Sequence, residues 1–399
     1  MNRIKKLTAV ILAFAMVLAL ASCTTPISLT KEWSFKNSTE ELPIGVYIYS
    51  LYTAYNQAST YAKDAEGYDA AKSFMDLTIK DEDGKESVAK DWILTQAKKI
   101  TKSILAIDTE LEKMGVTASP DQVELAKESS KIDWEQGGQN ASYYAQMGYQ
   151  MTPYKNILEP YGISFESYHK STYLAQVMQD TLFRAIYDEG GTKAVSDEDL
   201  QKFFLDSYTD YSYFQVNFKK SSTDKDGNAT SVAMTDKEKE AVKKNLDKYV
   251  SLINKDGKDY KAAVDQYMKD YKDTVTTDPT VSATEIVDKS SSLTNDDLKA
   301  AIKKLETGKA TVVSSGEGEN EVCYVVYKGD IKKSKYINNN RISVVAGMKI
   351  DEFNSFVDEI TEKVEYEENT SAISRYNPTM FEDFSDVTTT SANDSTNDE

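Results

Sequence analysis

Apolar side chains recur at helical spacing over much of the chain. In Ser87–Met114 they are spaced alternately by four and three positions, at Ile93, Ala97, Ile100, Ile104, Ile107, Leu111 and Met114. This pattern predicts one long helix with a single buried face, which Gly115 ends as a helix C-cap does. The same spacing predicts helices over Val46–Ala62 and Ser164–Tyr187. We therefore expect a mostly helical module over residues 42–209.

Two further helices in this module are predicted from their first residues. Ser119-Pro120-Asp121-Gln122 combines a capping residue, a proline at the first helical position and a Gln three residues after the Ser. That is the pattern of a capping box, and it predicts a helix to about Ser130. Ser196, followed by three acidic residues, predicts a helix to Tyr208.

The segment Trp134–Tyr161 has neither helical nor strand periodicity. It contains a Gly pair, two prolines and many Tyr and Met residues, which predicts a loop with short helical pieces. Tyr and Met side chains suit adaptable recognition, so the segment is a candidate contact surface. The alternative is that these side chains only pack back on the helices. The candidate peptide contacts are Tyr143, Tyr144, Met147 and Tyr149.

From Tyr211 the pattern changes to alternating strands and helices. Turn residues and period-two stretches delimit the strands, and period-3.6 stretches delimit the helices. The predicted order is strand Tyr213–Phe218, helices Thr235–Asn254 and Asp259–Tyr271, strand Thr284–Val287, helix Asn295–Leu305, and strands Ala310–Ser314 and Glu321–Lys328. We predict a compact α+β domain over residues 210–332. A last helix, Lys349–Val364, lies in a C-terminal segment, 333–384.

The two ends of the chain are predicted to lie outside these domains. Residues 1–22 combine basic residues, an apolar run and a Leu-Ala-Ser-Cys ending, which is the order of a signal peptide. Because the ending resembles the lipobox of bacterial lipoproteins, we expect Cys23 to be acylated and residues 23–41 to be a lipidated tether. An ordinary secretory peptide or an anchoring helix is the alternative. Residues 385–399 have a composition that predicts disorder.

Charge narrows the classes of partner. The chain has 47 Lys and Arg against 65 Asp and Glu, a net charge of −18, and residues 1–22 carry three of the basic side chains and none of the acidic ones. The processed chain therefore has a net charge of −21. Such a chain repels phosphate backbones, which excludes nucleic acid as a partner.

The residues of most enzyme sites are scarce. The chain has one histidine, His169, which we interpret as a surface or half-buried side chain, and Cys323 is interpreted as a buried structural thiol. No phosphate loop, paired cysteines or nucleophile elbow occurs. The stretch Ser222–Ala233 only partly matches a calcium loop, and we interpret it as a hairpin turn. No metal or cofactor site is predicted.

The order of these parts resembles the parvulin-type extracytoplasmic foldases, the PrsA and SurA group. Such proteins combine a helical, SurA- or trigger-factor-like chaperone module, a parvulin-like domain with a small mixed sheet, and a C-terminal helix that returns to the module. The resemblance extends from about residue 42 to 366. The stretches that carry it are Leu111–Val123, Tyr161–Ser171, Val195–Val216, Leu298–Val313 and Cys323–Lys328.

The resemblance fails where the chemistry of the family resides. Active parvulins have a histidine on the first strand and another on the last, but here those stretches read Gln215-Val216-Asn217-Phe218 and Val322-Cys323-Tyr324. The glycine-rich stretch expected before Asn295 is also missing. No catalytic residue can be carried over. The resemblance implies a degenerate domain that keeps a peptide groove, with candidate contacts at Phe214, Val216, Phe218 and Tyr324.

Three functions follow as hypotheses. The first is a membrane-anchored chaperone or foldase for unfolded or nascent exported polypeptides, without efficient isomerase activity, on the outer face of the bacterial cell membrane. Its clients would lie where the helical module meets the α+β domain. The alternatives are an active but divergent prolyl isomerase, and a solute-binding or surface-interaction lipoprotein. The oligomeric state is left open.

Overall fold

The computed structural model describes residues 32–223, 225, 228–272 and 275–386. Contacts divide the chain into two compact units. Unit 1 comprises Met1–Thr192 and Asp351–Glu399, and unit 2 comprises Lys193–Ile350. Each unit combines helices with antiparallel strands, so the predicted α+β class is confirmed. Within the described residues, no helix is both long and apolar enough to span a bilayer.

Unit 1 is built on two long helices that pack along each other, α2 (Ile44–Ala62) and α3 (Ala89–Met114). Their buried stripes supply half of the buried residues of this core, which include Ile48, Leu51, Ile93 and Ala97. Gly115 adopts the left-handed conformation expected of a C-cap, with φ 65°. Both helices were predicted because their apolar periodicity is continuous. The short strands β3 (Thr78–Lys80) and β4 (Glu86–Val88) form a hairpin between them.

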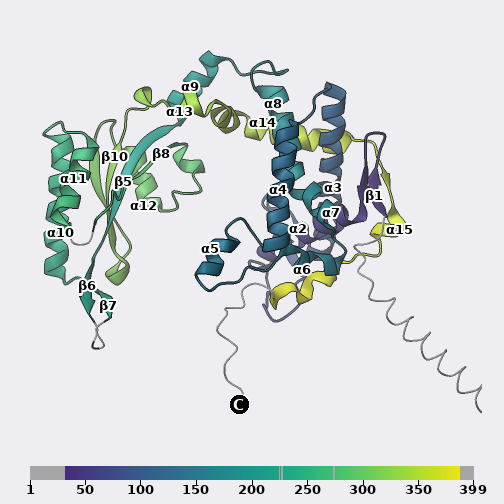
Figure 1. The fold of residues 1–399 in the computed structure, drawn as a ribbon, viewed down its shortest axis with the longest axis horizontal. Helices are drawn as coiled ribbons and strands as arrows, with labels where there is room; N and C mark the ends of the chain where they lie inside the picture. The colour runs from purple at the N-terminus through teal and green to yellow at the C-terminus, as the bar shows by residue number, and fades with distance from the viewer. Residues whose placement is uncertain (1–31, 224, 226–227, 273–274, 387–399) are drawn as a thin grey trace, which may run out of the picture. The chain divides into compact units, whose positions relative to one another are not determined.

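The remaining helices of unit 1 follow α3 along the chain, and all but α5 have buried residues (Figure 1). They are α4 (Pro120–Gln136), α5 (Ala141–Gln146), α6 (Tyr154–Leu158), α7 (Phe165–His169), α8 (Ala175–Tyr187) and α15 (Thr370–Ile373), with the 3₁₀ turns Glu159–Tyr161 and Pro378–Asp386. Helix α4 runs beyond the predicted end at Ser130. Ser119 occupies the N-cap position but makes no side-chain cap hydrogen bond, so the predicted capping box is not formed.

A small sheet, in the order β11-β1-β2, places residues 33–43 beside residues 367–368 in unit 1. Strand β1 (Trp33–Lys36) pairs antiparallel with β2 (Glu41–Pro43) and with β11 (Glu367–Glu368). Phe35, fully buried, packs on Tyr366 at 5.0 Å between ring centroids. Residues 33–41, predicted to belong to the tether, are therefore part of the folded unit, and the C-terminal segment returns to the helical unit as expected.

The helix predicted over Ser164–Tyr187 is continuous but contains one wide turn. A π-helical turn, Lys170–Leu174, joins α7 to α8. Such turns insert an extra residue into a helix and occur often at functional sites. Here the turn carries Lys170 and Tyr173, whose side chains bind buried carboxylates.

Unit 2 contains a four-stranded antiparallel sheet in the order β8-β5-β10-β9. Its strands are β5 (Thr209–Asn217), β8 (Val281–Glu285), β9 (Ala310–Ser315) and β10 (Val322–Lys328). Its helices are α9 (Asp197–Ser207), α10 (Asp236–Asn254), α11 (Tyr260–Asp270), α12 (Asp296–Lys304) and α13 (Tyr336–Asn339), with 3₁₀ turns at Val287–Lys289, Gly318–Asn320 and Ile331–Lys333. The boundary at Ile350 falls within α14 (Arg341–Lys363). The predicted order of strands and helices is observed.

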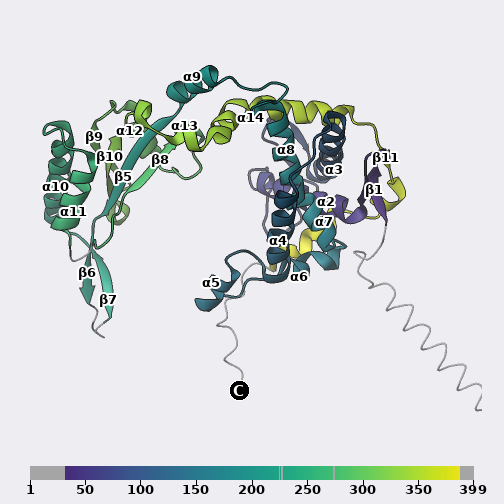
Figure 2. The same cartoon turned by 45° about the horizontal axis from the view of Figure 1, so that its top comes forward.

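Alternation along the strands gives this sheet a core on each face. Phe214, Val216 and Val325 face α10 and α11, whereas Tyr211 and Val326 face α12. Figure 2 shows α10 and α11 side by side along the sheet. The side of β5 that faces α10 and α11 is buried at Phe214 and Val216, whereas on the opposite side Tyr211 is buried and Gln215 is exposed.

One prediction for unit 2 is confirmed and one boundary differs. Strands β6 (Lys219–Thr223) and β7 (Ala229–Ala233) pair antiparallel, which confirms the hairpin interpreted from Ser222–Ala233. Helix α9 belongs to this unit because Phe204 and Tyr208 pack on Tyr336.

Candidate functional site

Large apolar side chains are exposed mainly on one segment of unit 1. Of eleven such side chains among the described residues, six lie between Tyr143 and Tyr154, with exposed fractions of 36% to 61%. These are Tyr143, Tyr144, Met147, Tyr149, Met151 and Tyr154. The first four are the sequence-predicted contacts of this segment. Figure 1 shows the short helix α5 standing out from the longer helices of unit 1.

This segment carries no charge, although 28% of the whole chain is Asp, Glu, Lys or Arg. Residues 136–154 contain only Gly, Gln, Asn, Ala, Ser, Tyr, Met, Thr and Pro, and we call them the uncharged segment. Tyr, Ser, Gly and Asn are the residues enriched in adaptable binding loops, because Tyr supplies a large contact area at a low entropic cost. Exposed apolar patches of this kind mark interaction surfaces in soluble proteins.

The uncharged segment is fixed to the end of α4. Gly137, the C-cap of α4, has φ 84°, and a Cβ atom there would lie 2.5 Å from the carbonyl oxygen of Thr152. The backbone of the segment therefore lies directly against the helix end, where only glycine fits. Glu135, just before the segment, and Lys155, just after it, form an ion pair that joins its two ends.

A buried carboxylate lies one turn before that C-cap. Asp133 is 9% exposed, and its Oδ2 atom accepts hydrogen bonds from the hydroxyls of Tyr168 (3.3 Å) and Tyr173. Within the described residues, it makes no ion pair. Burial, followed by the charge of Asp133, raises the pKa of Tyr168, and burial and the hydrogen bond to Asp133 raise that of Tyr173 to about 12. Both hydroxyls are thus protonated donors at neutral pH.

His169 ends helix α7, next to Tyr168. Its Nδ1 atom is 3.0 Å from Ser130 Oγ, and its ring stacks on Phe165 with centroids 5.9 Å apart. Burial lowers its pKa, as do the nearby charges of Lys127 and Lys170. It is half-buried, as one of the two sequence interpretations held.

A second polar cluster ties the N-terminal strands to the π-helical turn. Lys170 Nζ donates to Asp108 Oδ2 at 2.7 Å and lies 2.9 Å from Glu40 Oε2, an ion pair that is not aligned as a hydrogen bond. Burial, then the hydrogen bond with Asp108, raises the pKa of Glu40 to about 7, against the opposing effect of Lys170. Burial disfavours the ammonium of Lys170, but Asp108 and Glu40 together raise its pKa. The cluster is titratable near neutral pH.

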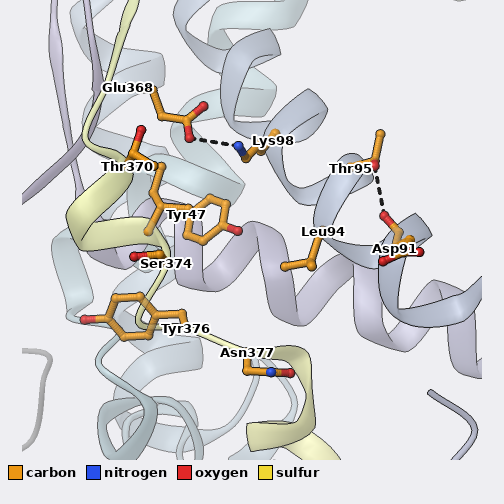
Figure 3. A pocket seen from close by; sticks show the side chains of 11 residues that line it. Tyr47, Asp91, Leu94, Thr95, Lys98, Glu368, Thr370, Ser374, Tyr376 and Asn377 are labelled. Carbon is orange, nitrogen blue, oxygen red and sulfur yellow. Dashed lines mark hydrogen bonds and ion pairs between the residues drawn. The ribbon is translucent and has the colours of Figure 1, made fainter. Parts of the chain in front are cut away.

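Unit 1 also has a hollow of about 540 Å³ between α2, α3 and the C-terminal segment (Figure 3). Figure 3 shows the Tyr47 hydroxyl pointing into the space among the labelled side chains, below the ion pair of Lys98 with Glu368 (2.8 Å). Tyr47 is fully buried, and its hydroxyl has no hydrogen-bond partner within the described residues. A small acceptor, such as a carbonyl oxygen or a water molecule, would satisfy this hydroxyl.

The four candidate contacts of the α+β unit are core residues in this structure. Phe214, Val216 and Phe218 are at most 4% exposed beneath α10 and α11, and Tyr324, 8% exposed, packs against the α12 side. A peptide could reach them only if these helices moved. Of the eight candidate contacts, only the four in the uncharged segment are exposed in this structure.

The stretches of β5 and β10 where the sequence resemblance would require histidines carry neutral groups. Gln215 lies opposite Tyr324 in the β5–β10 register, and Gln215 Nε2 donates to Asn217 Oδ1 at 2.7 Å. Tyr213 packs edge-on against Tyr324, and burial raises its pKa. Amides and protonated phenols can donate hydrogen bonds, but none of them exchanges a proton readily at neutral pH.

Of the two cysteines, only Cys323 lies within the described residues. Cys323 is fully buried, with Ser314 Oγ 3.1 Å from its sulfur, which confirms the interpretation as a structural thiol. Cys23, the predicted lipidation site, lies outside the described residues. Within those residues, no three or more His, Cys, Asp or Glu side chains are grouped to hold a metal ion.

Sequence reasoning missed Asp133 and Glu40. A signal for Asp133 was present, because it continues the stripe of small residues formed by Ala126 and Ser130 on α4. A charged residue on a buried helical stripe marks a site that needs polar partners. Nothing local marks Glu40, whose partner Lys170 is distant in sequence.

The chain was compared with known proteins. No protein-family model and no curated protein matches it. Among solved structures, the foldase protein PrsA from Streptococcus pneumoniae str. Canada MDR_19A is 14% identical, with 76% of this chain and 98% of that chain covered and a TM-score of 0.34. PrsA from Bacillus subtilis is also 14% identical, with 72% and 91% covered and a TM-score of 0.26. Similarity at this level does not assign the chain to a family.

Proposed function

We propose that the chain is a chaperone-type foldase that holds unfolded segments of exported polypeptides on its uncharged segment. The observation that carries this proposal is the exposure of six large apolar side chains on the nineteen residues of the uncharged segment, 136–154. Burying a side chain of this size against a client contributes about 1.5–3 kcal/mol. Several such contacts suffice for weak, reversible binding.

The location that we propose is the outer face of the cell membrane, where a lipid on Cys23 would tether the chain. The support for it is the order of basic, apolar and small residues before Cys23. Labelling with a radioactive fatty acid in a bacterial host tests this point. Loss of the label in Cys23→Ser is expected, and label retained on that variant would contradict the proposal.

The direct test is suppression of client aggregation by the chain from Thr24 to Glu399, made without lipid. Light scattering of a chemically unfolded client should fall as the chain is added. The variant Tyr143→Ser/Met147→Ser/Tyr149→Ser should need at least about fivefold more protein for the same effect, because about 1 kcal/mol or more of contact is lost.

A matched control replaces three exposed apolar side chains elsewhere, Tyr68→Ser/Val232→Ser/Val281→Ser, and should act like the parent chain. If the parent chain gives no suppression at severalfold molar excess, the proposed function is wrong. If both triple variants lose activity equally, the uncharged segment is not the client surface.

The alternative of an active, divergent prolyl isomerase is tested separately. A protease-coupled assay on a prolyl peptide should show no rate increase with added chain, because Gln215 and Asn217 carry amide groups that cannot act as an acid or a base. A rate proportional to the chain concentration would establish catalysis.

A further inference from the structure

We propose that Asp133 and the tyrosine rings around it receive the cationic side chain of a Lys or Arg residue in the bound polypeptide. The chain would then prefer client segments in which a basic residue adjoins aromatic or aliphatic residues. This inference rests on the proposed function and names the substrate class of the same surface.

The first argument is the unmatched charge of Asp133. Its Oδ2 atom accepts two neutral hydroxyls, from Tyr168 at 3.3 Å and from Tyr173, while no cation pairs with it within the described residues. A carboxylate that is largely withdrawn from water is costly unless a countercharge is close. A cation brought to this position is attracted more strongly than it would be at an exposed acid, because less water screens the interaction.

The second argument is the aromatic surrounding. The ring of Tyr168 lies 5.7 Å from those of Tyr49 and Tyr154 and 5.6 Å from that of Trp134. Tyrosine and tryptophan faces attract ammonium and guanidinium groups. Tyr154 is 36% exposed, so one ring of the cluster reaches the surface. Carboxylate and ring faces together suit a cation on a long apolar stem, as in Lys and Arg.

The third argument is continuity with the client surface. Asp133 precedes Gly137 by one helical turn, and Gly137 contacts the backbone of Thr152. Tyr154 belongs both to the uncharged segment and to the ring cluster around Tyr168. A client segment that lies on the exposed Tyr and Met side chains therefore passes beside the carboxylate.

Charge complementarity supports a basic occupant. Residues 119–161 contain six acidic and three basic side chains, and one of the basic ones, Lys155, is paired with Glu135. The uncharged segment has no Lys or Arg of its own that could occupy the position. A purely structural role for Asp133, joining α4 to the π-helical turn, predicts no dependence of client affinity on client charge.

The test compares two labelled peptides that differ only in one central residue, Arg or Gln, flanked by aromatic and aliphatic residues. Fluorescence anisotropy measures their binding to the chain from Thr24 to Glu399. We expect the Arg peptide to bind about tenfold more tightly, a ratio that Asp133→Asn reduces to less than about threefold. The charge-matched control, Glu128→Gln, removes an exposed acid of the same helix and should keep the ratio.

The outcomes separate the two proposals. If neither peptide binds the parent chain, the proposed function fails and this inference with it. If both peptides bind but the Arg preference is absent, or persists in Asp133→Asn, only the inference fails.

A second measurement needs no variant and covers the case in which Asp133→Asn does not fold. A Lys peptide is joined to the parent chain with a zero-length carbodiimide, and the linked residue is found by mass spectrometry. Linkage to Asp133 is expected, and linkage confined to exposed acids such as Glu128 would overturn the inference.

Discussion

The pH dependence of unit 1 should change when Glu40 is replaced by Gln. Glu40 lies beside Asp108 and shares Lys170 with it. Burial raises the pKa of Glu40 from 4.5 to about 7, so the native chain holds a proton here more tightly than the unfolded chain does. The stabilisation from this proton is complete below about pH 4.5 and is lost as the pH rises through about 7. Glu40→Gln, an uncharged isostere, should remove this loss.

The size of the effect follows from the pKa change. One pKa unit corresponds to about 1.4 kcal/mol, so a rise from 4.5 to about 7 sets an upper bound of about 3 kcal/mol. The Glu40 side chain is 30% exposed, and water screens part of the interaction, so we expect about 1–2 kcal/mol. Lys170 keeps its hydrogen bond to Asp108 in the variant, so no buried cation is left unpaired.

The assay is urea unfolding followed by tryptophan fluorescence. All three tryptophans, Trp33, Trp92 and Trp134, lie in unit 1, so the signal reports this unit alone. The free energy of unfolding of the parent chain should fall between pH 5 and pH 8 relative to that of Glu40→Gln. The two chains should be nearly equal at pH 5.

The control is Glu41→Gln, which removes the exposed neighbouring acid and should follow the parent chain at both pH values. Equal changes in Glu40→Gln and Glu41→Gln between pH 5 and pH 8 would refute the reasoning. So would a variant Glu40→Gln that is less stable than the parent chain at pH 8.

Three further substitutions or probes test other parts of the structure. Gly45→Ala should destabilise unit 1 by about 1–3 kcal/mol in the same urea assay, because the added Cβ would meet Ser167 on α7; an unchanged midpoint would contradict this packing. Tyr47→Phe should leave stability unchanged or raise it by up to about 1 kcal/mol, because the hydroxyl has no partner, and a loss above 1 kcal/mol would show a bound group in the hollow. Cys323, whose pKa is raised by burial, should react with a maleimide only as unit 2 unfolds, and rapid labelling of the native chain would show an open sheet.

The sequence by itself determined the elements and their order. Helices α2 and α3 were predicted from apolar residues that recur three and four positions apart. Strands β5 and β10 were predicted from runs of residues that favour strands, bounded by turn residues. Helix α10 forms the capping box between Thr235 and Glu238 that its sequence allows. Such signals are local, because hydrogen bonds within a helix or turn connect residues close in sequence. The α+β class follows from this order alone.

The tertiary structure decided which apolar side chains of these elements are exposed to a binding partner. The apolar residues of β5 and those of the uncharged segment looked alike as candidate contacts, yet Phe214 is fully buried and Tyr143 is 61% exposed. Composition cannot separate them, because burial depends on whether another element covers the residue. Helices α10 and α11 cover β5, and in the described structure no element covers the uncharged segment to the same extent.

Contacts between distant residues were likewise set only by the fold. Strand β1 pairs Phe35 with Glu368, and Lys170 reaches Glu40 and Asp108. Bringing such distant residues together costs chain entropy, which the local periodicity of the sequence does not reveal. The burial of apolar side chains from many elements in one core offsets that cost. The carboxylates Glu40 and Asp133 are buried because elements distant in sequence pack around them, and no single stretch of the sequence predicts that packing.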